Sequence, residues 1–188
     1  MDGLLSTTIL QDMVLPAGLI SVVFALLLAR NVLGQDRGTR AMQEVAGTIF
    51  EGAVAFIRRQ YTTIALMAIV GSIGIGALIS AFETQAVAET SVYGIDLGIR
   101  TGVAFLFGAV CSMASGIIGM YISVKSNLRT TAAASKGVVK AVQVAMRGGA
   151  VSGFLVVALS LLGVYAVFVA FGGLTNPADA PFLIVGYG

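Results

Sequence analysis

Apolar residues occur in four long runs without a charged side chain, and polar residues gather between them. The runs extend over residues 13–29, 61–82, 101–124 and 148–174. A helix needs about 20 mainly apolar residues to cross the roughly 30 Å hydrocarbon layer of a bilayer. Each run therefore predicts a membrane-spanning helix, the first extended to residue 33, and an apolar run from Pro181 predicts the start of a fifth. The predicted fold class is all-α, a polytopic transmembrane helix bundle.

The segments between the runs also carry helical patterns. From residue 40 to residue 59 apolar side chains recur with helical spacing, which predicts that the second span continues as a helix beyond the membrane. Residues 126–146 have a similar pattern. Gly148-Gly149 marks either a junction with the fourth span or a tight turn. Pro16 is expected in the first turn of the first helix, where its missing amide costs nothing.

Positive charge is concentrated in two of these segments. The first holds Arg30, Arg37, Arg40, Arg58 and Arg59, and the second holds Lys125, Arg129, Lys136, Lys140 and Arg147. Arg100 is the only other cation, while the segment after residue 82 carries Glu83, Glu89 and Asp96. Because Lys and Arg favour cytoplasmic loops, we expect residues 34–60 and 125–147 in the cytoplasm, and residues 83–98 and the amino terminus outside.

The composition indicates the same class of protein. Hydrophobic residues make up 57% of the chain and charged residues 11%, where soluble domains carry about 25% charged residues. This predicts an integral membrane protein with the lipid bilayer as a partner. The net charge of +2 arises from cations in the segments that flank the apolar runs, where they set membrane orientation, so no nucleic-acid partner is expected. With no histidine and one cysteine, Cys111, the chain has no basis for disulfides, Cys/His zinc sites or histidine catalysis.

Small residues at four-residue spacing predict close helix contacts, because helices in lipid associate by tight packing. The third run holds two such stripes, Gly108/Ser112/Gly116 and Ser115/Gly119/Ser123, the second run offers Ser72 and Gly76, and the fourth offers Gly149 and Gly153. Gly71, Gly74 and Gly76 do not form a phosphate loop, because no lysine or acid follows them. Packing is the expected role of these residues.

The four runs lack the carboxylates that ion pumps place inside the membrane. Magnesium-assisted phosphoryl chemistry needs clustered carboxylates, and the expected cytoplasmic segments offer only Asp36, Glu44 and Glu51, which are ordinary helix-surface charges. An ion path through these helices is therefore not expected. We assign no catalytic, cofactor-binding or metal-binding residue to this chain.

Several short motifs resemble one family in their combined order. They are Met42-Gln43-Glu44-Val45-Ala46, Glu51-Gly52-Ala53, Arg59-Gln60-Tyr61, Gly108-Ala109-Val110, Ser115-Gly116, Gly119-Met120, Asn127, Arg129-Thr130, Ala132-Ala133-Ala134, Gly148-Gly149, Gly153 and Leu161-Leu162-Gly163. Together they cover most of residues 38–163 and resemble the amino-terminal part of the membrane-bound, ion-pumping pyrophosphatases.

The resemblance implies a homodimeric, magnesium-dependent enzyme that hydrolyses cytoplasmic pyrophosphate and pumps protons or sodium outward. It leaves open whether the enzyme also uses K⁺. A bacterial or archaeal inner membrane is the expected location. Residues 59–64 resemble the proton-pumping branch. The family's aspartate-rich magnesium and pyrophosphate motifs are absent here, so the chain is expected to be an inactive amino-terminal fragment that supplies outer helices.

Two alternatives remain open from the residues themselves. A rotor-ring proteolipid of a rotary ATPase can have four glycine-rich spans, but it needs a mid-membrane acid that these runs lack. A small, non-enzymatic membrane accessory protein is compatible with the spans. Only the resemblance and the short final apolar run argue against it.

Overall fold

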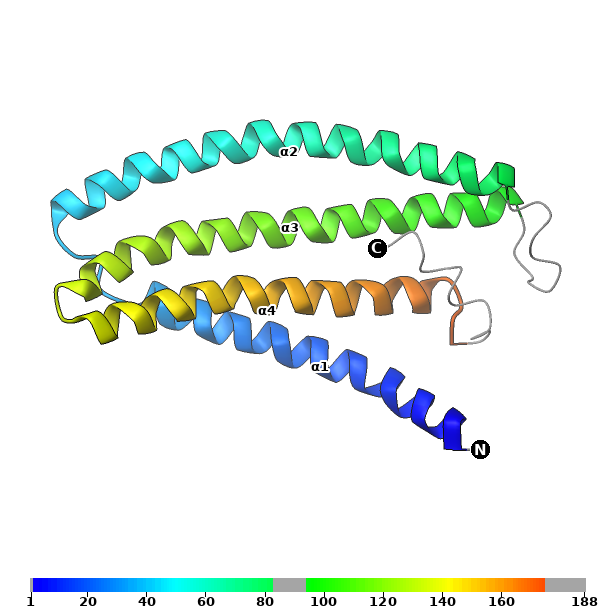
Figure 1. The fold of residues 1–188 in the computed structure, drawn as a ribbon, viewed down its shortest axis with the longest axis horizontal. Coiled ribbons are helices and arrows are strands. Elements are labelled where there is room, and N and C mark those ends of the chain that lie inside the picture. Colours follow the sequence, from blue (N-terminus) through cyan, green and yellow to red (C-terminus); the bar gives the residue numbers. More distant parts are fainter. Residues whose placement is uncertain (1, 83–93, 175–188) are drawn as a thin grey trace. The chain divides into compact units, whose positions relative to one another are not determined.

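The chain folds into long α-helices in a computed structural model that describes residues 2–82 and 94–174. The helices are α1 (Asp2–Leu33), α2 (Arg40–Phe82), α3 (Gly94–Ala134) and α4 (Val138–Ala170) (Figure 1). Within these ranges there is no strand, which confirms the all-α prediction. The fifth apolar run and most of the predicted external loop lie outside the described residues.

All four helices are long and apolar enough to cross a membrane. Helix α2 has 43 residues, and a rise of 1.5 Å per residue gives it a length of about 65 Å. Because this is about twice the thickness of a hydrocarbon layer, α2 must continue well beyond it. The prediction that residues 40–59 extend the second span as a helix is therefore confirmed.

The first helix begins earlier than Pro16 suggested. Helix α1 starts at Asp2 and contains Pro16 in its interior, so the prediction that this proline marks the helix start is wrong. A proline inside a helix removes one backbone hydrogen bond. Residues on both sides of Pro16 keep the helical conformation, so this single loss does not end α1.

The boundaries of α3 and α4 also differ from those predicted from the sequence. Residues 126–146 do not form one helix, because α3 ends at Ala134 and α4 begins at Val138. Gly148 and Gly149 lie inside α4 without a break. At its other end α4 stops at Ala170, four residues before the apolar run ends. Gly172 has a φ of 82° there, and the Gly173 amide donates to the Phe168 carbonyl at 2.8 Å, which is a Schellman cap.

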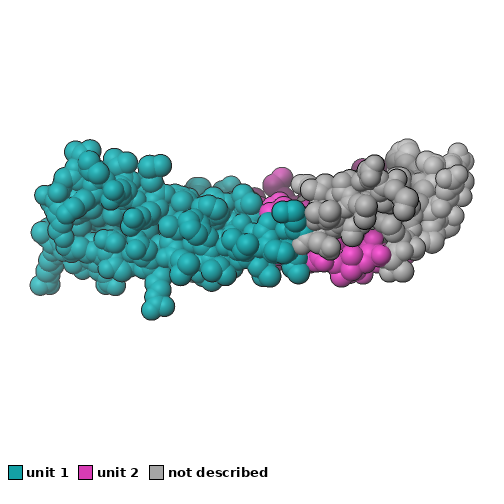
Figure 2. Space-filling model, turned by 90° about the horizontal axis from the view of Figure 1, so that it is seen from below, with its two compact units in different colours: residues 1–60, 113–159 teal, residues 61–112, 160–188 magenta. Residues whose placement is uncertain are grey.

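The described residues form two compact units, coloured in Figure 2. Among the described residues, unit 1 comprises residues 2–60 and 113–159, and unit 2 comprises residues 61–82, 94–112 and 160–174. In unit 1, α1 packs on α4 through the rings of Phe24 and Phe154, whose centroids lie 4.8 Å apart. The buried hydrophobic side chains of this unit are small or medium aliphatic groups: Ala25, Val32, Ile122, Ala132, Val144, Val151 and Ala158.

Unit 2 contains a close contact between α2 and α3. The Ser72 hydroxyl donates to the Gly102 carbonyl oxygen at 2.8 Å. A Cβ atom on Gly76 would lie 2.9 Å from the carbonyl oxygen of Gly98, so only a glycine fits at this position. The predicted packing role of Ser72 and Gly76 is confirmed, while their partners Gly98 and Gly102 were not singled out by the sequence pattern.

The predicted small-residue stripes of α3 and α4 are used only in part. Ser115 and Gly119 are buried, and Gly119 packs against Ser152 of α4. In contrast, five other residues of the predicted small-residue pattern lie at exposed positions: Ser112, Gly116, Ser123, Gly149 and Gly153. Nothing lies within 4 Å of the Cβ positions of Gly149 and Gly153. Helix α4 instead approaches α3 through Gly148, which packs on Ser126.

Candidate functional site

Polar side chains meet in unit 1 where α1 ends and where α3 gives way to α4. We call this group the polar junction. It comprises the side chains of Asn31, Asp36, Arg129, Lys136 and Arg147 and the backbone of Leu33 and Gly38. It joins the two segments in which the sequence concentrates its cations. Their meeting within one compact unit means that both segments lie at the same end of that unit.

Arg129 is the centre of the polar junction. Its side chain is buried, and its Nε and Nη2 atoms both donate to the Leu33 carbonyl oxygen, at 3.1 and 2.8 Å. Its Nη1 atom donates to the Lys125 carbonyl oxygen at 2.7 Å. Leu33 is the last residue of α1, where carbonyl groups lack helical partners and the helix dipole favours a positive charge. Arg129 thus caps α1 from a residue 96 positions away.

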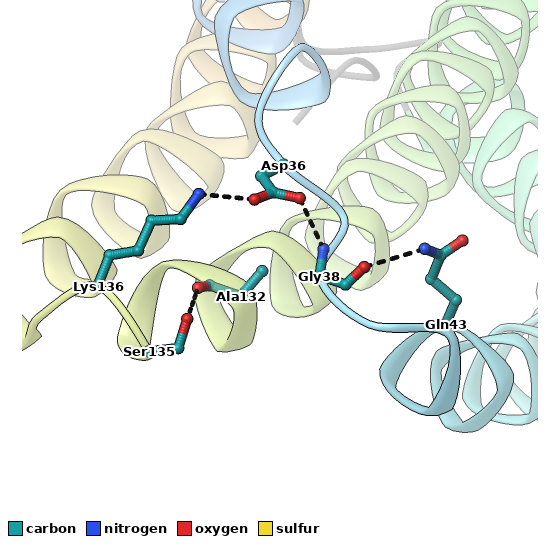
Figure 3. A network of polar contacts seen from close by, with 6 residues as sticks. All are labelled: Asp36, Gly38, Gln43, Ala132, Ser135 and Lys136. Carbon is teal, nitrogen blue, oxygen red and sulfur yellow. Dashed lines mark hydrogen bonds and ion pairs between the residues drawn. The ribbon is translucent and has the colours of Figure 1, made fainter.

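The loop after α1 is held by Asp36 (Figure 3). Its Oδ2 atom accepts from Lys136 Nζ at 2.6 Å, and its Oδ1 atom accepts from the Gly38 amide at 3.0 Å. Gly38 has a φ of 70°, a left-handed conformation that favours glycine. A third contact links the same segments, because Arg147 Nη1 donates to Asn31 Oδ1 at 2.8 Å.

The Asp36–Lys136 pair makes stability depend on pH. The hydrogen bond from Lys136 and that from the Gly38 amide hold the pKa of Asp36 below its usual value. A lowered carboxyl pKa contributes stability above the pKa of the unfolded chain, and this contribution is lost as the pH falls through the folded pKa. We expect Lys136→Met to lower the melting temperature slightly at neutral pH, because both side chains are half exposed.

In strongly acidic solution that difference in melting temperature should disappear, and high salt should reduce it. The measurement is thermal unfolding of the two proteins across the acidic range. A difference that stayed constant after Asp36 was protonated would contradict this assignment.

A cavity of about 340 Å³ opens beside the polar junction in unit 1. Its cationic lining residues are Arg37, Lys125 and Arg129, and the rings of Phe50 and Tyr121 form part of its wall. Lys125 Nζ lies 4.3 Å from the centroid of the Phe50 ring and 5.7 Å from that of Tyr121. We call this space the basic cavity, since no carboxylate is among the described residues that line it.

The described residues contain no cluster of metal-ligand side chains. Across residues 2–82 and 94–174, no group of three His, Cys, Asp or Glu side chains could hold a metal ion. Asp36 pairs with Lys136, and Glu44 pairs with Arg40 at 3.2 Å on the surface of α2. The magnesium ion implied by the resemblance does not fit this part of the chain. Gly71, Gly74 and Gly76 lie inside α2, not in a phosphate-binding loop.

In the sequence analysis, the charges of Arg129, Lys125 and Arg37 served only to predict which segments are cytoplasmic. It did not predict the cap on Leu33 or the basic cavity. One available signal was the position of Lys125 and Arg129, four residues apart and directly after an uncharged run. This spacing places both side chains on one face of a helix.

Four long apolar helices with their basic residues outside the charge-free runs define a multi-pass membrane protein. Residues 19–188 match the model of the inorganic H⁺ pyrophosphatase family. The chain belongs to this family, which confirms the resemblance found in its motifs.

Curated relatives agree with the family. The chain is 44% identical over 176 residues to the K(+)-insensitive pyrophosphate-energized proton pump 2 of Moorella thermoacetica, covering 93% of this chain and 23% of the relative. It is 42% identical to the K(+)-insensitive pyrophosphate-energized proton pump of Caldanaerobacter subterraneus subsp. tengcongensis, covering 91% and 23%. It is 33% identical to the pyrophosphate-energized membrane proton pump 3 of Arabidopsis thaliana, covering 90% and 22%. The chain thus spans less than a quarter of the length of these relatives.

Proposed function

We propose that the whole protein hydrolyses pyrophosphate and uses the energy to pump protons out of the cytoplasm. The family match over residues 19–188 carries this proposal. The relatives are named pyrophosphate-energized proton pumps, which supports protons over sodium as the transported ion. Two of these relatives are named K(+)-insensitive, which supports a pump that needs no potassium.

Within that pump, the helices described here act as scaffold. Their charge-free runs offer no carboxylate to carry an ion, and the described residues offer no metal cluster. Magnesium, which would neutralise pyrophosphate and assist its hydrolysis, is therefore held by residues elsewhere in the protein. The whole protein is a homodimer in the cell's inner membrane.

The orientation follows from the distribution of charge. Residues 34–60 and 125–147 lie on the cytoplasmic side, the amino terminus lies outside, and residues 13–33, 61–82, 101–124 and 148–174 cross the bilayer. Nine of the eleven cations lie in these two segments and Arg30 lies at the adjoining end of residues 13–33, which supports this orientation. The Lys136–Asp36 contact joins those two segments, and Arg129–Leu33 and Arg147–Asn31 join the second segment to the end of residues 13–33. These contacts in unit 1 support the placement of both segments on one side of the membrane.

The test is proton transport by the whole protein in inside-out membrane vesicles. Adding pyrophosphate with magnesium should acidify the vesicle interior without potassium or sodium, as reported by quenching of a pH-sensitive dye. A protonophore should abolish the pH gradient while hydrolysis continues. Hydrolysis that accumulates sodium, needs potassium, or produces no proton gradient would contradict the proposal.

A further inference from the structure

The basic cavity carries a positive charge that nearby acids do not neutralise. Arg37, Lys125 and Arg129 line it, and none of its described lining residues is acidic. Two of the three acids of the same segment are engaged elsewhere, since Asp36 pairs with Lys136 and Glu44 with Arg40. The third, Glu51, is not among the lining residues of the cavity. Several cations around one small space repel one another unless an anion enters it.

The geometry of these cations leaves donors available. A guanidinium group has five N–H donors, and Arg129 uses three of them on the carbonyl oxygens of Leu33 and Lys125. These bonds hold the Arg129 side chain in place as part of the wall of the basic cavity. The ammonium group of Lys125 lies over the faces of Phe50 and Tyr121, a contact that positions it without neutralising it.

The basic cavity lies where the uncharged runs end, and lipid headgroups are expected at the ends of such runs. Leu33 ends α1, and Lys125 directly follows the uncharged run 101–124. Tyr121, which is 46% exposed, lines the same cavity, and tyrosine with lysine or arginine is typical of the membrane interface. Beside this space, the exposed side chains of α2 include Val45 and Ile49, which suit contact with acyl chains.

We propose that the basic cavity binds the headgroup of an anionic phospholipid from the cytoplasmic leaflet. The lipid phosphate accepts hydrogen bonds from Arg37 and Lys125 against the side formed by Arg129, and the acyl chains lie along the apolar flank of α2. Basic pockets between helices on the cytoplasmic side are suited to such headgroups. A lipid fits better than a free phosphate because of the apolar surroundings. The proposal depends on the orientation given above and not on the pumped ion.

The experiment measures lipid binding to the purified whole protein by native mass spectrometry. Dioleoylphosphatidylglycerol is the anionic probe and dioleoylphosphatidylcholine is the zwitterionic comparison. Arg37→Gln combined with Lys125→Gln removes two cavity charges and spares Arg129. The matched control is Arg30→Gln combined with Lys140→Gln, which removes the same charge from the same proposed side, outside the basic cavity. Pyrophosphate hydrolysis by each preparation is recorded separately.

We expect phosphatidylglycerol to bind roughly tenfold or more tightly than phosphatidylcholine, and the cavity variant to lose this preference. The control should keep it, as should a variant that exchanges the cations, Arg37→Lys with Lys125→Arg, which guards against misfolding of the first variant. An unchanged preference in the cavity variant would overturn the proposal. Displacement of the lipid by millimolar inorganic phosphate would also overturn it, since the site would then bind a soluble anion. Pyrophosphate hydrolysis can persist whether or not the lipid binds. A failure of the lipid-site proposal is therefore distinguishable from a failure of the proposed pump function.

Discussion

Arg129→Met is expected to lower the free energy of unfolding by about 3 kcal/mol, since hydrogen bonds from a charged donor and a stranded carbonyl each carry a substantial cost. Arg129 is buried and makes three hydrogen bonds to the carbonyl oxygens of Leu33 and Lys125. Methionine fills part of the space but donates none of these bonds. The end of α1 then loses both its partner and a favourable charge.

The measurement is unfolding of the whole protein in a mixed-micelle denaturant titration. Arg40→Met is the matched control, because Arg40 lies in the same charged region but its ion pair with Glu44 is highly exposed. We expect it to change stability by less than about 0.5 kcal/mol. Arg129→Lys should recover only part of the loss, since one ammonium does not reproduce the planar fork of a guanidinium. Equal losses in Arg129→Met and Arg40→Met would contradict the capping role.

Gly76→Ala and Gly98→Ala are each expected to destabilise the protein by about 1–3 kcal/mol, the usual cost of overpacking. A Cβ atom on Gly76 would lie 2.9 Å from the Gly98 carbonyl oxygen, and one on Gly98 would collide with the Ser80 hydroxyl and the Gly76 carbonyl oxygen. Because two of these obstacles are backbone atoms, α2 and α3 must separate. Their separation also weakens the bond between Ser72 and Gly102.

Gly74→Ala provides the control for this prediction. Gly74 is exposed on the same helix, two residues from Gly76, and nothing lies within 4 Å of its Cβ position. Alanine is a better helix former than glycine by up to about 1 kcal/mol, so this variant should be unchanged or more stable. The same denaturant titration distinguishes the variants. A Gly76→Ala protein as stable as Gly74→Ala would show that α2 and α3 do not meet at this point.

The helices could be predicted from the sequence because the bilayer imposes a simple rule. Any charge-free run of about 20 residues must pair its backbone groups internally, and a helix does so. The extension of α2 followed from helical spacing in residues 40–59. Pro16 and Gly148-Gly149 were misleading, because proline and glycine disfavour helix only by an amount that the surrounding helix can absorb.

The contacts between helices were harder to predict. Four-residue spacing identifies small residues but not the face that meets another helix, so Gly119 packs while Gly116 and Ser123 are exposed. The polar junction depends on pairs separated by 96 to 116 residues, such as Arg129–Leu33 and Arg147–Asn31. Local patterns contain no information on such pairs. Charge counting grouped these cations in two segments but did not distinguish the capping Arg129 from the exposed charges.

The orientation of the basic segments is the central claim, and labelling of introduced cysteines in intact cells tests it most directly. In a protein whose native thiol is removed by Cys111→Ala, single cysteines are placed by Glu89→Cys and by Lys140→Cys. Lys140 is exposed in α4, and Glu89 lies in the predicted external segment. A membrane-impermeant maleimide should label the Glu89 position in intact cells and the Lys140 position only after permeabilisation. Labelling of the Lys140 position in intact cells, with protection of the Glu89 position, would contradict the account.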